Sequence, residues 1–347
     1  MRRKAILAAA ALATASVLGL AACSSGSSTT GGDSTASASD VTIAAPLSGQ
    51  LGDKSFMDSA NAGLQKAADE LGVKVKVIEA GADDAPAWER NLTEASASGD
   101  NSLIVTGGTV IASTLEKVAA QFPDQKYLIF DSPSVGSNVT GISYAQNEGA
   151  FLVGALAALI TTNPAEFPRA TGSGKIGVAG GMDIPVIQDF ITGFTQGAKA
   201  VDPSIQVDVR FINDFASAQK GYDIAMAQYN DGADVVYQVA GAAGLGVLQA
   251  GADSGRYAIG TDSDQNDLHS DSTPASAIKS VDNTVFDAIK SFTAGDLQMG
   301  TTIAGNISND GVGIAFNDAL VPDSIQKQVD DLRQQVIDGT ITVDSAL

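Results

Sequence analysis

Residues 41–72 read VTIAAPLSGQLGDKSFMDSANAGLQKAADELG and contain one complete strand-to-helix unit. The apolar run 41–46 predicts a short buried strand, and 56–71 repeats apolar residues at helical spacing. The turn between them, 47–55, holds two glycines and no group typical of a catalytic centre. The rest of the fold is predicted by searching the chain for further strand-to-helix units of this kind.

The same alternation continues to the end of the chain. Short, nearly all-apolar strands that alternate with amphipathic helices are typical of parallel sheets covered on both faces. The predicted strands are 41–46, 73–80, 102–107, 126–131, 139–145, 175–180, 207–212, 234–240, 257–262 and 275–280. The predicted helices are 56–71, 86–98, 111–121, 148–162, 185–200, 217–231, 244–254, 282–294 and 323–338.

These strands are too many for one sheet, and the pattern restarts near residue 148. We therefore predict two doubly wound, Rossmann-like α/β lobes. The N-terminal lobe is expected to contain 41–143 plus about 276–300. The C-terminal lobe is expected to contain 144–275 plus about 301–347.

The N-terminus has the features of a bacterial lipoprotein. Residues 1–22 combine a basic start, MRRK, with a short apolar run, which predicts a signal peptide. Leu20-Ala21-Ala22-Cys23 resembles the lipobox, in which the cysteine thiol accepts a diacylglycerol. Residues 23–40 have the Ser/Gly/Thr composition of a flexible tether. We therefore expect a protein anchored through Cys23 on the extracytoplasmic face of the cell membrane.

Composition narrows the function further. The 347 residues carry a formal charge of −20, with a pI of about 4.2. Such a surface repels phosphate backbones, so we do not expect nucleic-acid binding. Cys23 is the only cysteine, so no intrachain disulfide can form.

Catalytic motifs are not found. The single histidine, His269, lies in the polar run SDQNDLHSDS (263–272), and the chain has no G-x-S-x-G elbow. GSGK (172–175) fails as a phosphate loop because Arg169 and Ile176 stand where glycine and Ser/Thr are required. We therefore predict no catalytic residue.

Metal and cofactor signatures fail as well. DSDQNDLHSDST (262–273) resembles a calcium loop, but Asp267 replaces the required glycine and Thr273 the bidentate glutamate. GAAGLG (241–246) lacks the G-x-G-x-x-G spacing of dinucleotide sites. We therefore predict neither a metal site nor a cofactor.

A ligand-binding pattern remains at the carboxyl ends of predicted strands. Asp131, Gly241 and Asp262 stand at or just past strand ends, and Phe215 follows a fourth strand closely. In open parallel sheets ligands bind in the crevice outside these ends. Aromatic rings can sandwich a planar group, and carboxylates can accept hydrogen bonds from neighbouring hydroxyls.

Several longer motifs carry a resemblance to a known family. They are GDKSF (52–56), EGAFLVGALAAL (148–159), GGMDIPVIQDFITGF (180–194), GADVVYQVAGAAGLGVLQA (232–250), IGTDSDQ (259–265), KSVDNTVFDAI (279–289) and DGVGIAF (310–316). With them the chain resembles the basic membrane protein (BMP) family of substrate-binding lipoproteins, which includes the purine nucleoside receptors of ABC importers. The resemblance covers about 41–320. It implies a type I periplasmic-binding-protein fold, in which two lobes joined by three crossing strands close over a ligand.

The resemblance also implies which residues hold the base. Phe56 and Phe215 match the aromatics, one from each lobe, that stack on it, and Asp131 matches a strand-end aspartate that contacts the ligand. Two positions depart from the family pattern. Leu47 stands where an aspartate is usual, and Met57 where asparagine is frequent. These departures imply fewer hydrogen-bonding groups for the base in the first lobe, and they leave the base itself open.

The sugar end is implied in the same way. Asp262 and Lys279 match the residues that hold the ribose, and Gly241 matches the turn that approaches the sugar. The usual Gly-Gly of that turn is Gly241-Ala242 here. From the residues alone, without the family resemblance, Lys279 is predicted to be a surface lysine at a strand edge.

We therefore expect a lipid-anchored, monomeric receptor that captures a nucleoside, with a purine as the base, and delivers it to an ABC permease. One alternative is the same receptor role for another small sugar-like or planar ligand. A second is an enzyme such as a nucleoside hydrolase, against which the missing nucleophile–base pair argues. A third is a signalling or adhesion lipoprotein with a degenerate cleft.

Overall fold

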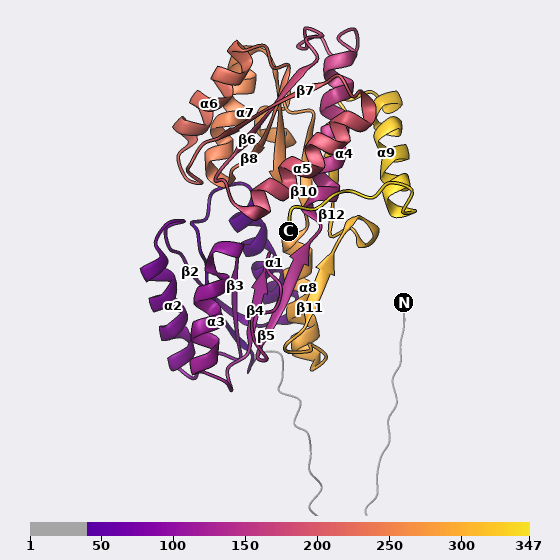
Figure 1. Ribbon diagram of the computed structural model, residues 1–347. Coiled ribbons are helices and arrows are strands. Elements are labelled where there is room, and N and C mark those ends of the chain that lie inside the picture. Colours follow the sequence, from indigo (N-terminus) through magenta and orange to yellow (C-terminus); the bar gives the residue numbers. More distant parts are fainter. Residues whose placement is uncertain (1–39) are drawn as a thin grey trace, which may run out of the picture. The chain divides into compact units, whose positions relative to one another are not determined.

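The computed structural model describes residues 40–347, and these contain twelve strands arranged in two six-stranded sheets (Figure 1). The predicted signal peptide and Cys23, with all of the predicted tether except Asp40, lie outside the described residues. The ten predicted strands and nine predicted α-helices are all present, each within two residues of its predicted bounds. The α/β fold with two doubly wound sheets is therefore confirmed.

The first sheet has the order β11-β5-β4-β3-β1-β2, and all of its strand pairs are parallel. Its strands are β1 (Thr42–Pro46), β2 (Lys74–Ile78), β3 (Leu103–Gly107), β4 (Tyr127–Phe130), β5 (Val139–Tyr144) and β11 (Thr302–Gly305). The helices that accompany it are α1 (Phe56–Leu71), α2 (Ala85–Ala97), α3 (Ala112–Gln121) and α8 (Val281–Ala294), with the short 3₁₀ helix η2 (Thr109–Ile111) before α3.

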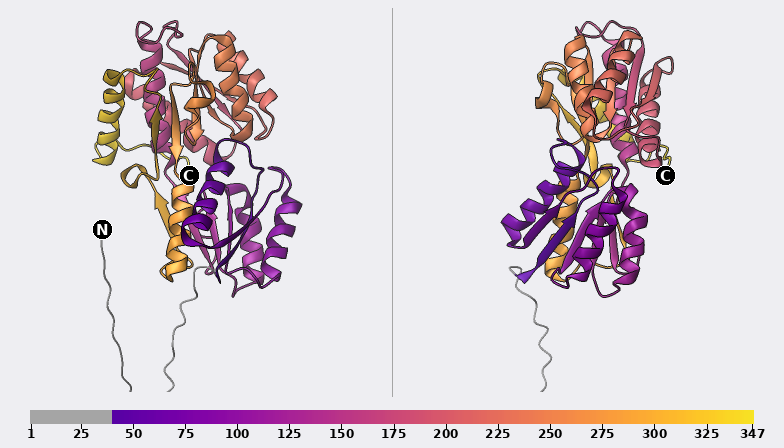
Figure 2. Two further views of the ribbon diagram at one scale, coloured as in Figure 1. Left: turned by 180° about the vertical axis from the view of Figure 1, so that it is seen from behind. Right: turned by 90° about the vertical axis from the view of Figure 1, so that its left-hand side faces the viewer.

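Alternation along β1 explains how this sheet is covered. Ile43 and Ala45 belong to one core cluster with α1 and α8, whereas Ala44 belongs to another with α2 and α3. Successive side chains of a strand point to opposite faces, so β1, which is apolar after Thr42, packs on helices on both sides. Figure 2 shows α8, coloured orange, beside the indigo and purple helices of this first lobe.

The second sheet has the order β12-β10-β9-β8-β6-β7, and only the β10–β12 pair is antiparallel among the described strands. Its strands are β6 (Lys175–Gly180), β7 (Gln206–Phe211), β8 (Val235–Val239), β9 (Tyr257–Asp262), β10 (Ala275–Lys279) and β12 (Val312–Phe316). Its helices are α4 (Gln146–Thr162), α5 (Pro185–Val201), α6 (Ala218–Asn230), α7 (Gly244–Ser254) and α9 (Asp323–Ile337), with the 3₁₀ helices η3 (Gly241–Ala243), η4 (Asn266–His269) and η5 (Ile307–Asn309).

Between residues 40 and 347 the chain passes from one sheet to the other three times, after β5, β10 and β11. These passages agree with the three crossing strands of the expected type I fold. The sheets divide the C-terminal part differently from the predicted lobes, however. β10 belongs to the second sheet although 276–300 was assigned to the first lobe, and β11 belongs to the first sheet although 301–347 was assigned to the second. α8 packs against α1 of the first lobe.

The strands β11 and β12 are absent from the prediction. Both lie at sheet edges, and β11 has only four residues, of which three are exposed. The apolar run that identifies a buried strand is therefore missing in β11. Edge strands of this length are weak signals in any sequence.

The close packing of α4 against α5 fixes one wall of the site. α4 is buried almost along its whole length, and a Cβ at Gly193 or Gly197 of α5 would lie 2.0 or 1.9 Å from a carbonyl oxygen of α4. Only glycine lets the two backbones approach this closely. In residues 40–347 no helix, α4 included, is both long and apolar enough to span a membrane.

Candidate ligand-binding site

A cavity of about 250 Å³ lies at the carboxyl ends of the strands and is lined by residues of both lobes. The position agrees with the crevice expected for open parallel sheets. All six residues predicted to bind the ligand line this cavity. They are Phe56, Asp131, Phe215, Gly241, Asp262 and Lys279. The structure thus brings them together, and their contact with a ligand stays a prediction.

A buried ammonium with two carboxylates forms the polar end of the cavity. Lys279 Nζ lies 2.9 Å from Asp131 Oδ1 and 3.7 Å from Asp262 Oδ1. All three residues are at most 8% exposed. The longer distance exceeds that of a hydrogen bond, and Asp262 Oδ1 has no other partner in the described structure. One buried acceptor therefore remains unused.

The ionisation of this cluster follows from burial and charge. Burial raises the pKa of Asp262 above its usual value, although Lys279 and the Ser55 hydroxyl act in the opposite direction. Burial alone would lower the pKa of Lys279, but the Asp131 and Asp262 carboxylates outweigh it and raise that pKa. The lysine is therefore a permanent cation at neutral pH, held by two anions.

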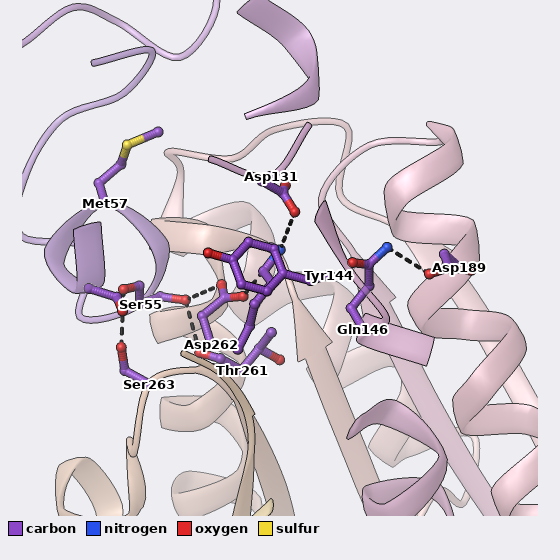
Figure 3. A network of polar contacts seen from close by, with 12 residues as sticks. Ser55, Met57, Asp131, Tyr144, Gln146, Asp189, Thr261, Asp262 and Ser263 are labelled. Carbon is purple, nitrogen blue, oxygen red and sulfur yellow. Dashed lines mark hydrogen bonds and ion pairs between the residues drawn. The ribbon is translucent and has the colours of Figure 1, made fainter. Parts of the chain in front are cut away.

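Ser55 links the lobes at this point, a role that the sequence does not predict. Its hydroxyl lies 2.8 Å from Asp262 Oδ2 and 2.9 Å from the carbonyl oxygen of Thr261 (Figure 3). The Ser55 side chain therefore does not cap α1, although serine is a common N-cap residue. Asp53 alone does so, because its carboxylate accepts the backbone N–H groups of Ser55, Met57 and Asp58.

A second interlobe link runs through Gln265, which is 1% exposed. Its Nε2 donates to the carbonyl oxygen of Lys54 at 2.9 Å, while its Oε1 accepts from Gln238 Nε2 at 2.8 Å and from the Thr261 N–H at 3.0 Å. Lys54 itself has a left-handed φ of 53°, and its side chain is exposed. Gln265 therefore holds a strained turn of the first lobe from the second. Only its place in the IGTDSDQ motif could have pointed to it.

Aromatic rings surround the ammonium. Lys279 Nζ lies 4.8 Å from the ring centroid of Phe56, 5.1 Å from that of Phe190 and 5.6 Å from that of Tyr144. These distances allow cation–π attraction. Phe190 also lines the cavity, and neither it nor Tyr144 is predicted from the sequence, because both occur in apolar stretches that read as core.

Phe215 is positioned by two glycine-rich turns of the second lobe. A Cβ at Gly181 would lie 2.3 Å from Phe215 Cε1, so the ring rests directly on that glycine. The Phe215 carbonyl oxygen accepts the Ala243 N–H at 3.0 Å. Gly241, close to this contact, has a φ of 53°, a backbone conformation that residues with a side chain rarely adopt.

The two departures from the family pattern lie in different surroundings. Leu47 is 1% exposed in the core and is not part of the cavity lining. Met57 does line the cavity, and its Cε lies 3.0 Å from the position of a Cβ on Gly49. The first lobe thus presents a thioether at that point of the wall.

The fold and this cavity define a two-lobed solute-binding protein. The family model described as "ABC transporter substrate-binding protein PnrA-like" (Bmp) matches residues 40–346, and the chain belongs to this family. The family consists of substrate-binding receptors and not of enzymes. The protein is therefore a solute-binding protein of an ABC transporter, a class that acts outside the cytoplasm and serves a permease.

Individual relatives agree with this assignment. The chain is 32% identical over 369 residues to the CD4+ T-cell-stimulating antigen of Listeria innocua, covering 99% of each chain. It is 32% identical over 363 residues, again 99% of each, to the ABC transporter nucleoside-binding protein BmpA of Lactococcus lactis. An ABC transporter solute-binding protein from Aeropyrum pernix superposes with a TM-score of 0.80 at 26% identity, covering 87% of this chain and 92% of that one.

Proposed function

We propose that this protein binds a nucleoside, with a purine as the base, in the interlobe cavity and delivers it to the permease of an ABC importer. The observation that carries the proposal is the unused acceptor Asp262 Oδ1, buried between the two lobes beside Asp131 and Lys279. A buried carboxylate oxygen without a donor is costly, and a ligand hydroxyl would satisfy it.

The cluster as a whole suits a sugar with neighbouring hydroxyls. Asp131 and Asp262 supply acceptors and Lys279 supplies donors, so each hydroxyl of a ribose can both give and receive a hydrogen bond. Gly241 lets the backbone approach the sugar. The aromatic residues Phe56 and Phe215 provide the faces between which a planar base can stack.

The ligand class is also supported by a relative. The Lactococcus lactis protein, whose match covers 99% of this chain, is named as a nucleoside-binding protein. The lining carries three carboxylates and one ammonium, so its net charge of −2 disfavours phosphorylated ligands. The purine as base rests on the family resemblance and on the stacking area of the two rings.

Delivery and anchoring complete the proposal. Binding favours the closed arrangement of the lobes, which the permease then recognises. The protein acts as a monomer held in the cell membrane by a diacylglycerol on Cys23, after removal of residues 1–22. Replacement of Cys23 by Ala should move the protein from the membrane fraction to the aqueous phase. Retention in the membrane would contradict the anchor.

Calorimetry with a panel of nucleosides, free bases and pentoses tests the ligand class. We expect saturable binding of purine nucleosides and weak binding of the separate base or sugar. No binding of any nucleoside would refute the proposal. Mass spectrometry of the co-purified ligand would then identify another sugar-like or planar compound, the alternative receptor role.

A further inference from the structure

We propose that Gln50 is the residue that hydrogen-bonds the edge of the base and accepts either an exocyclic amine or a carbonyl there. The inference rests on the proposed nucleoside ligand. It starts from the uneven distribution of polar side chains around the cavity.

The second lobe offers the base no polar side chain. Apart from Asp262 and Lys279, which form the polar end, its lining residues are apolar or glycine. The large ones are Ile184, Val186, Ile187, Phe190, Phe215 and Val239. Any side chain that reads the edge of the base must therefore come from the first lobe.

Two of the polar lining residues of the first lobe are already engaged. Ser48 is 3% exposed, and its hydroxyl donates at 2.6 Å to a carbonyl oxygen of β3. Both oxygens of Asp53 accept backbone N–H groups at the start of α1. Besides Asp131 at the polar end, Gln50 and Thr109 remain, and both are exposed.

The backbone on either side of Gln50 is held in place. Gly49 packs against Met57, and the Leu51 N–H donates to Glu79 Oε2 at 2.8 Å. Between these anchors the Gln50 side chain makes no hydrogen bond to any residue of 40–347. An amide fixed at its base and unengaged at its tip is available to a ligand.

The chemistry of the amide suits a purine edge better than that of a hydroxyl. Gln50 presents a donor and an acceptor in one plane, and a half-turn of the amide exchanges them. It can thus match a base with an exocyclic amine and, after rotation, a base with a carbonyl. We expect adenosine and inosine to bind with affinities within about tenfold of each other, because either orientation makes the same number of hydrogen bonds.

The test removes the Gln50 amide from the protein and the exocyclic amine from the ligand, separately and together. Adenosine and purine riboside differ only by the exocyclic amine, and their dissociation constants are measured by calorimetry on the purified full-length protein. For the wild type, loss of the amine should weaken binding about tenfold, the scale of one hydrogen bond. For Gln50→Met, which keeps the length of the side chain, the two ligands should differ by less than about twofold.

Thr109→Val is the matched control from the same rim of the cavity, and it should keep the wild-type difference. The inference is overturned if Gln50→Met keeps the tenfold difference, or if it weakens both ligands equally. Failure of the wild type to bind any nucleoside would instead overturn the proposed function. The two results are therefore distinguishable.

Discussion

Asp131, which follows β4 in the first lobe, and Asp262, the last residue of β9 in the second, have the same left-handed backbone conformation, with φ of 60° and 68°. Both carboxylates lie close to the ammonium of Lys279. Residues other than glycine adopt this conformation at a cost, and such strain gathers at functional sites. The two carboxylates therefore point from different sheets toward the same group, the ammonium of Lys279. Through its contact with Asp131, Lys279 links the second lobe to the first.

Asp262→Asn should weaken nucleoside binding by about 1.5–3 kcal/mol, the value of a hydrogen bond to a charged group. The amide has the same shape but lacks the negative charge that favours a hydroxyl donor. Calorimetry measures the effect. The neighbouring surface carboxylate Asp264 serves as a control, and Asp264→Asn should bind as the wild type does. Equal affinities of Asp262→Asn and wild type would contradict the placement of the sugar.

Phe215→Ala should weaken binding by roughly 1–3 kcal/mol, because a stacked base loses one aromatic face. Phe215→Tyr, which keeps the ring, should stay within a few-fold of the wild type. If Phe215→Ala binds normally, the ring on Gly181 only fills space. Thermal unfolding of both variants distinguishes a change in the site from a change in the fold.

Binding should depend on pH through Asp262. The ionised carboxylate accepts the ligand hydroxyl, and burial raises the pKa of this group above the usual value. Affinity should therefore fall on acidification at a pH above the ordinary range for aspartate, and be constant at higher pH. Calorimetry from neutral pH downward checks this. The acid-induced loss should disappear in Asp262→Asn, and its persistence in that variant would assign it to another group.

Asp234 should control acid stability. This buried carboxylate accepts hydrogen bonds from Thr161, Thr171 and Ser173. Burial would raise its pKa, but these donors outweigh burial and lower it below the usual 3.8. Its stabilising contribution is therefore complete above the unfolded-state pKa and is lost as the pH falls through the lower folded-state pKa.

Asp234→Asn should accordingly lower the free energy of unfolding by at least about 2 kcal/mol at neutral pH, since an amide cannot accept all of these donors. Urea unfolding at neutral and acidic pH measures this. The difference between variant and wild type should shrink toward low pH. A constant difference would show that the charge is not responsible.

Ser55→Ala should weaken ligand binding more than it lowers stability. The hydroxyl bonds to Asp262 Oδ2 from the opposite lobe, so its removal leaves that carboxylate less well oriented. We expect a roughly tenfold loss of affinity, the value of one hydrogen bond to a charged group at the low end of its range. Ser98→Ala, in an exposed turn after α2, is the control. A wild-type affinity for Ser55→Ala would leave the link without a role in binding.

Much of the fold is predictable because its signals are local. The apolar runs of β1, β6 and β9 and the helical spacing of α1 and α7 give bounds within two residues of those observed. The edge strand β11 is not predictable in this way, because three of its four residues are exposed, and β12 is likewise a short strand at a sheet edge. The assignment of β10 to the second sheet and of β11 to the first also depends on strand pairing between distant parts of the sequence, which local patterns do not show.

The residues of the site also fall into a group that can be predicted from local sequence and a group that cannot. Residues at the ends of strands, such as Asp131 and Asp262, can be selected from sequence because the sheet brings strand ends together. Ser55 and Gln265 cannot, since their significance comes from partners more than two hundred positions away in the chain. Phe190 and Tyr144 are not predictable for another reason: an aromatic ring that contacts the buried ammonium of Lys279 has the same sequence surroundings as one that packs only in the core.

The late position of β11 has a consequence for biosynthesis. Strands β1 to β5 leave the ribosome long before residues 302–305, which form the outer strand beside β5. Until then β5 presents an unpaired edge to any other chain that offers a strand. A chain that ends between β5 and β11 therefore keeps this edge of the first sheet open to pairing with another chain.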